Sequence, residues 1–144
     1  MSPDWKTEWL AAIQIPLANK FISRCHFRGR IRSHDQCIVL RNQLADIIAV
    51  AALRPIEGYQ LLTAVAVDPA YQGRGCAKQL LRDMTVRFDE STYTFSLDYL
   101  QALYQQLGFR RILKTDLQDA LRSRFHAYEK QGREMSPMAY GAAD

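Results

Sequence analysis

The hydrophobic pattern of this chain changes abruptly near its middle. From Tyr59 to Val67 apolar and β-branched residues dominate, which predicts a strand that ends at the Asp68–Pro69 pair, since a residue before proline favours extended geometry. Beyond a short stretch with two glycines, apolar residues return at the three- and four-residue spacing of an amphipathic helix. These positions are Ala77, Leu80, Leu81, Met84 and Phe88. The pattern therefore predicts a strand, a glycine-containing turn and a helix in direct succession.

The segments before this strand predict a hairpin and two short helices. Apolar runs at Cys37–Leu40 and Ala45–Leu53, separated by a polar turn, are typical of paired strands. Further upstream, Trp5, Trp9, Ala12 and Ile13 recur at helical spacing, so residues 4–14 are predicted to form a helix. Pro16 fits the first turn of a second helix that ends near Cys25, followed by an arginine-rich loop.

The segments after the central helix alternate between strands and helices. Thr92–Leu97 predicts a strand, and the helix after it ends at Gly108. Phe109–Leu113 predicts another strand, after which Thr115–Gln118 fits a capping box at the start of a last helix. Met135–Tyr140 predicts a final strand, and its proline at 137 cannot donate to a ladder, which favours the edge of a sheet.

Taken together, these elements predict an α/β fold with a mostly antiparallel sheet of about five or six strands and helices on both faces. With 144 residues and 48% hydrophobic content, the chain has the size of one domain spanning residues 1–144.

The glycine-containing turn carries the first chemical signal. Gly73 and Gly75 have no Cβ to keep a ligand away from the backbone, and the first N–H groups of the helix have no partner inside it. Phosphate oxygens are favoured at such a helix start. A dinucleotide fingerprint is disfavoured, because Lys78 stands where a third glycine is required and a meander precedes the turn.

The stretch Val67-Asp-Pro-Ala-Tyr-Gln-Gly-Arg-Gly-Cys-Ala77 resembles the acetyl-CoA-binding motif of the GNAT superfamily of N-acetyltransferases, Arg/Gln-x-x-Gly-x-Gly/Ala. A second stretch, Tyr104-Gln-Gln-Leu-Gly-Phe109, is similar to the Tyr-x-x-x-Gly-Phe helix end of the same family. The resembling part runs from about Cys37 to Lys114. Because the family usually begins with a strand and none is predicted here, the first strand is either missing or replaced.

The resemblance implies an acyltransferase that moves acetyl from acetyl-CoA to a primary amine in a ternary complex, without an acyl-enzyme. Strand backbone would pair with pantetheine, and backbone amides of the turn would hold pyrophosphate. The implied cofactor-binding residues are Val65, Ala66, Val67, Gln72, Gly73, Arg74, Gly75, Cys76, Ala77 and Lys78. Tyr104 is the implied catalytic acid, with a core tyrosine as its structural alternative. The glutamate that some relatives use as a base is absent, because Tyr59–Val67 contains no carboxylate.

Charge distribution indicates an acceptor class. The net charge is +4, yet residues 20–34 contain five Lys and Arg residues and no acid, so the excess is local. Arg28 and Arg30 are candidate substrate-binding residues for an anionic amine acceptor: a small molecule, an acidic peptide or aminoacyl-tRNA. A solvated loop, or one arginine on the 3′-phosphate of CoA, is the alternative. Other nucleic acid is not expected.

Other function classes are disfavoured by composition. Three cysteines without paired spacing predict neither a disulfide framework nor a metal site. Without a long apolar run or a leader-like start, we expect a cytoplasmic protein and no membrane partner. A non-catalytic acetyl-CoA sensor that regulates a partner protein is the second functional hypothesis, because a CoA-binding turn serves both.

Overall fold

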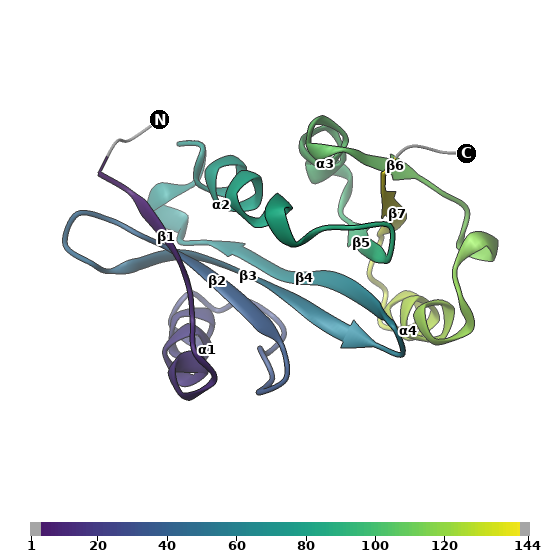
Figure 1. The fold of residues 1–144 in the computed structure, drawn as a ribbon, viewed down its shortest axis with the longest axis horizontal. Coiled ribbons are helices and arrows are strands. Elements are labelled where there is room, and N and C mark those ends of the chain that lie inside the picture. Colours follow the sequence, from purple (N-terminus) through teal and green to yellow (C-terminus); the bar gives the residue numbers. More distant parts are fainter. Residues whose placement is uncertain (1–3, 142–144) are drawn as a thin grey trace. The chain divides into compact units, whose positions relative to one another are not determined.

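A computed structural model describes residues 4–141 of the chain. Seven strands and four α-helices occur in this part (Figure 1). The strands are β1 (Lys6–Trp9), β2 (Gln36–Arg41), β3 (Ile47–Ile56), β4 (Tyr59–Val67), β5 (Thr92–Ser96), β6 (Phe109–Arg111) and β7 (Ser136–Tyr140). The helices are α1 (Ile15–Arg24), α2 (Cys76–Met84), α3 (Gln101–Leu107) and α4 (Asp119–Lys130).

The strands form a mostly antiparallel sheet in the order β1-β2-β3-β4-β5-β7-β6. Strands β1–β2, β2–β3, β5–β7 and β6–β7 pair antiparallel, whereas β4 and β5 pair parallel through Gln60–Leu62 and Thr92–Thr94. This α/β architecture confirms the predicted fold class. The chain divides into two compact units, one from residues up to Arg54 with Thr63–Val86, the other from Pro55–Leu62 with residues from Arg87 on.

The first unit contains β1, β2, most of β3 and the carboxyl half of β4, with one helix on each face of its sheet (Figure 1). Successive side chains of β2 point to opposite faces, so Cys37 and Val39 pack with Phe21 and Ile22 of α1 in one buried cluster. Helix α2 packs against β2 and buries Leu80, Leu81 and Met84. Helices thus cover both faces of this part of the sheet.

The second unit contains the hairpin tip of β3 and β4, strands β5, β7 and β6, and helices α3 and α4. Leu121 and Phe125 of α4 pack with Ile56, Leu61 and Phe95 in a buried cluster. The predicted end of α3 is confirmed, because Gly108 terminates this helix with φ of +112°. The predicted strands Thr92–Leu97 and Phe109–Leu113 are present but shorter, since β5 ends at Ser96 and β6 at Arg111. The predicted capping box is wrong, because α4 begins at Asp119 and has no side-chain cap.

Two strand predictions near the chain ends are also wrong. Residues 6–9 form β1 rather than a helix and pair with Arg41–Ile38 of β2, so the first strand is present. The tryptophan spacing misled because residues four apart, such as Trp5 and Trp9, share a face in a strand as well as in a helix, and β1 has only four residues in which to show a strand alternation. Strand β7 lies between β5 and β6, not at an edge. Pro137 is tolerated because the ladder with β6 ends at Arg111, opposite Met138, so its missing N–H falls beyond that ladder. Its carbonyl still accepts the Ile112 N–H at 3.2 Å.

Candidate functional site

The turn between β4 and α2 lies in the first unit and has the backbone of an anion-binding site. Gly73 and Gly75 have φ of +78° and +83°, a region that residues with a Cβ rarely adopt. A Cβ added at either position would meet no heavy atom within 4 Å, so the space beside this backbone is open. Gly75 is the N-cap of α2, and its carbonyl accepts the Gln79 N–H at 3.0 Å.

Several N–H groups of this turn are free to bind a ligand. Within residues 4–141, the N–H groups of Gly73 and Gly75 donate to no protein acceptor. The N–H groups of Cys76, Ala77 and Lys78 lie in the first turn of α2. They have no acceptor inside the helix, because the helix has not yet begun four residues earlier. Together with the positive end of the α2 dipole, these donors can hold a phosphate group.

The carboxyl half of β4 leads directly into this turn. Ala64 has φ of +58° inside the strand, which is an uncommon and strained conformation for a residue other than glycine. The side chains of Thr63, Ala64 and Val65 are consecutively half-buried, so the regular inside–outside alternation of a strand is interrupted here. Val65 and Val67 remain half-buried and Ala66 is buried.

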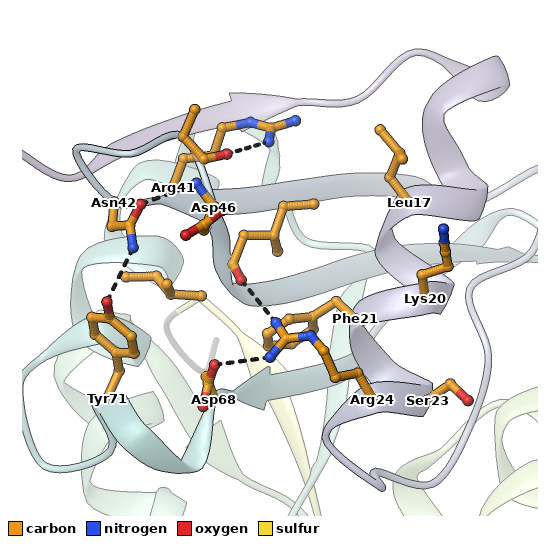
Figure 2. A pocket seen from close by; sticks show the side chains of 13 residues that line it. Leu17, Lys20, Phe21, Ser23, Arg24, Arg41, Asn42, Asp46, Asp68 and Tyr71 are labelled. Carbon is orange, nitrogen blue, oxygen red and sulfur yellow. Dashed lines mark hydrogen bonds and ion pairs between the residues drawn. The ribbon is translucent and has the colours of Figure 1, made fainter.

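Asp68 anchors the start of the turn. Its Oδ1 accepts the Ala70 N–H at 2.9 Å, and its own N–H donates to the Ile48 carbonyl at 2.9 Å. Arg24 of α1 extends toward the second carboxylate oxygen at 3.4 Å and stacks on the Phe21 ring (Figure 2). Arg24 therefore links α1 to the end of β4. We refer to residues 20–34, which contain Arg24, as the basic segment.

A cavity of about 890 Å³ lies between α1, the turn joining β2 to β3 and the segment after β4 (Figure 2). Lys20 and Arg24 lie along its α1 wall, while Asp46 and Tyr71 lie on the opposite side. Two basic residues of the 20–34 segment therefore face a space large enough for a small molecule or a short peptide.

Cys76 is the first residue of α2 and is buried. Burial raises the pKa of its thiol, and the Sγ lies 3.7 Å from the Tyr71 carbonyl. A thiol that stays protonated and inaccessible is a poor nucleophile, so Cys76 contributes its backbone to the turn.

Arg28 and Arg30 lie in an irregular segment between α1 and β2, as predicted for the arginine-rich loop. Their guanidinium groups are exposed, and within residues 4–141 neither group pairs with a carboxylate. They are available to an anion from solvent.

A buried ion pair fixes this basic segment to the sheet, and sequence reasoning missed it. Arg54 of β3 donates to both carboxylate oxygens of Asp35, with Nη2–Oδ2 at 2.9 Å, and to the Arg30 carbonyl at 2.7 Å. The side chains of Arg54 and Asp35 are 10% and 1% exposed. The signal available in the sequence was an arginine at the end of the long apolar run of β3, where only a paired charge is expected.

Tyr104 lies in the second unit, on α3, and is 3% exposed. Its ring meets Phe109 edge to face at 5.6 Å, and Phe109 meets Tyr140 at 5.3 Å in the same way. The Thr94 hydroxyl donates to the Leu62 carbonyl at 3.0 Å.

Burial raises the pKa of Tyr104 well above its ordinary value of 10.0. The phenol is therefore protonated at every pH in which the protein would work, as a proton donor must be. All ten candidate cofactor residues, together with Arg28 and Arg30, belong to the first unit, whereas Tyr104 belongs to the second.

Two searches for other kinds of site found nothing in the described residues. No group of three or more His, Cys, Asp or Glu side chains in residues 4–141 is arranged to hold a metal ion. Within the same residues, no helix has both the length and the apolar character that a membrane crossing requires.

Comparison with known families decides the family. A family model described as an acetyltransferase (GNAT) domain matches residues 33–111, which is more than half of the chain and includes the turn and Tyr104. The chain belongs to the GNAT family. No curated protein matches it.

Solved structures of GNAT proteins share the fold. N-acetylglutamate synthase from Neisseria gonorrhoeae, complexed with coenzyme A and L-arginine, has 14% identity and a TM-score of 0.69 over 99% of this chain. The chain spans only 34% of that protein's length. The ribosomal-protein-S18-alanine N-acetyltransferase from Escherichia coli has 19% identity and a TM-score of 0.64, covering 97% of this chain and 96% of its own.

A third neighbour is the GNAT family N-acetyltransferase YhbS from Escherichia coli in complex with CoA. It has 18% identity and a TM-score of 0.59, with 76% of this chain and 71% of the other covered. At these identities the neighbours establish the fold of this GNAT chain, and residue roles follow from its own geometry.

Proposed function

We propose that this GNAT protein is an N-acetyltransferase that moves the acetyl group of acetyl-CoA to a primary amine. The observation that carries the proposal is the open Gly73–Gly75 turn, whose free N–H groups meet the start of α2. Membership of the GNAT family and neighbours complexed with coenzyme A support acetyl-CoA as the donor.

In this proposal the pyrophosphate binds the N–H groups of the turn and of the first turn of α2, from Gln72 to Lys78. The pantetheine amides pair with backbone of Val65–Val67, as an added strand would. The interrupted alternation around Ala64 supports this role, because a strand whose pairing is disturbed has backbone groups to offer.

Tyr104 is the proposed catalytic acid for departure of the CoA thiolate. Burial raises the pKa of Tyr104 and so keeps its proton in place, but it also makes the phenol a weaker acid than a thiol, whose ordinary pKa is about 8.5. The hydroxyl therefore acts as an oriented donor that stabilises the departing thiolate through a hydrogen bond while the C–S bond breaks. The amine must itself lose a proton before it attacks the thioester. Strand β4 contains no carboxylate to remove that proton, and a water relay or desolvation of the amine on binding are the two routes proposed for this step.

Substitution of Gly75 tests the proposed cofactor site. Gly75→Glu would put a negative charge beside the pyrophosphate, so CoA affinity in calorimetry should fall by at least about tenfold, equivalent to about 1.4 kcal/mol. Gly132→Glu is a matched control, because Gly132 has φ of +78°, close to the +83° of Gly75, and open space around it, but lies in the second unit. Equal CoA affinity of the two variants would exclude the turn as the site.

The acceptor is proposed to be anionic, and Arg28 and Arg30 are proposed to bind it. Exposed guanidinium groups without protein partners pair with carboxylate or phosphate in a bidentate manner. Acidic peptides, phosphorylated amines and aminoacyl-tRNA share this chemistry.

Replacing both arginines separates this role from a cofactor role. Arg28→Gln with Arg30→Gln should raise KM for the acceptor and reduce its dependence on salt, because screening weakens charge attraction. KM for acetyl-CoA should stay nearly constant. If KM for acetyl-CoA rises instead, the arginines serve the cofactor; if neither constant changes, they are solvated surface charge.

A further inference from the structure

Arg74 stands between the two glycines of the turn, and the central carbon of its guanidinium lies over two aromatic rings. Its Cζ lies 5.0 Å from the ring centroid of Tyr71 and 5.7 Å from that of Trp5. The two rings meet edge to face at 6.0 Å. Arg74 is exposed, and within residues 4–141 its side chain pairs with no carboxylate.

Both rings are fixed by other parts of the first unit. Trp5 is 6% exposed, and its carbonyl accepts the Gln79 Nε2 of α2 at 3.2 Å. The Tyr71 hydroxyl accepts the Asn42 Nδ2 at 3.0 Å, so the turn between β2 and β3 supports this ring (Figure 2). Trp5, which precedes β1, contacts Arg74 directly. Asn42 of the β2–β3 turn supports Arg74 through the Tyr71 ring.

Stacking holds a guanidinium without using its hydrogen-bond donors. Cation–π attraction holds the positive charge of the Arg74 guanidinium without a carboxylate partner, and within residues 4–141 we observe no protein acceptor for its N–H donors. Arg24 provides the contrast: it stacks on Phe21 at 5.4 Å but directs its donors to Asp68 and the Ile47 carbonyl. Arg74 is therefore held in place with its charge and donors unspent, which is preorganisation for an external anion.

We propose that Trp5 and Tyr71 are positioning residues that hold the Arg74 guanidinium for a phosphate group of bound coenzyme A. The proposal rests on the proposed function and adds to it two residues outside the glycine motif. Coenzyme A offers this chemistry twice, in its pyrophosphate and in its 3′-phosphate, and Arg74 binds one of them.

A double-mutant cycle tests whether Trp5 acts through Arg74. CoA affinity is measured by calorimetry for the wild type, Arg74→Gln, Trp5→Leu and the double variant, with Lys130→Gln, an exposed charge of the second unit, as the control. Arg74→Gln should weaken binding about tenfold, as expected for a charge-assisted hydrogen bond, and Trp5→Leu about threefold. The double variant should bind no more weakly than Arg74→Gln alone. Lys130→Gln should match the wild type.

Dephospho-CoA, which lacks the 3′-phosphate, identifies the phosphate. If the effect of Arg74→Gln disappears with dephospho-CoA, Arg74 binds the 3′-phosphate; if it persists, Arg74 binds the pyrophosphate, and either result supports the proposal. Because Trp5 is buried, Tyr71→Leu repeats the cycle from the other ring should Trp5→Leu fail to fold.

Two results would overturn the positioning role while leaving the proposed function intact. The first is that the wild type binds CoA and the Arg74→Gln variant binds it with equal affinity. The second is that Trp5→Leu lowers CoA affinity by the same factor in the wild type and in the Arg74→Gln background. Trp5→Leu would then act through a general loss of structure and not through Arg74. A wild type that binds no CoA would instead refute the proposed function.

Discussion

At the scale of single residues, the structure gives Tyr104 both a packing role and a chemical one to test. Its ring is part of an aromatic cluster, as expected of a core tyrosine. Its raised pKa also keeps the phenol protonated, so its hydroxyl can donate a hydrogen bond to the departing thiolate. Removing only the hydroxyl separates these roles, because the packing is retained.

Tyr104→Phe should lower kcat by about 10²- to 10⁴-fold, the usual effect of losing one positioned acid, with CoA affinity unchanged. Tyr140→Phe is the matched control, since it removes a hydroxyl from the same aromatic cluster and should keep normal turnover. Full activity of Tyr104→Phe would assign this residue to the core alone.

The pH dependence of kcat gives a second readout for Tyr104. Because its pKa in the folded protein is raised above 10.0, the active, protonated form persists through alkaline pH. The wild type should therefore show no loss of kcat from this group below about pH 10. The raised pKa would be contradicted if kcat of the wild type declined below about pH 10 while the residual kcat of Tyr104→Phe did not.

At the scale of elements, the buried pair of Asp35 and Arg54 determines where the basic segment lies. Arg54→Met leaves a buried carboxylate without its partner, which typically costs ~3–5 kcal/mol, so the urea midpoint should fall markedly. Arg32→Met, which removes an exposed charge from the same segment, should change stability by less than about 0.5 kcal/mol. Similar midpoints for both variants would mean that the pair does not support the segment.

The elements also show why sequence reasoning succeeded in the centre of the chain and failed toward its ends. Strand β4 and the turn after it were predicted closely, because an apolar run bounded by glycine and proline has local causes. Strand β1 was missed because an exposed edge strand takes its stability from pairing with β2, a partner distant in sequence. Strand β7 was assigned to an edge because local rules for Pro137 cannot foresee that Phe109–Arg111 pairs with its other side.

At the scale of the whole molecule, motif residues could be predicted and their supports could not. The glycines of the turn and Tyr104 stand at fixed spacings, which a single sequence reveals. The supports join residues far apart in the chain, such as Trp5 with Arg74 and Asp35 with Arg54, and no local pattern records these contacts. That residues 1–144 act as a single domain stays a prediction.

The central claim concerns turnover, and release of free thiol from acetyl-CoA measures it most directly. The purified chain is incubated with acetyl-CoA and a panel of amines, acidic peptides and aminoacyl-tRNA, and thiol is followed alongside acetylation of the acceptor. We predict thiol release that depends on one class of acceptor, equals the acetyl group transferred, and is slowed by Tyr104→Phe. Tight binding of acetyl-CoA without acceptor-dependent thiol release would contradict the account and indicate a non-catalytic sensor.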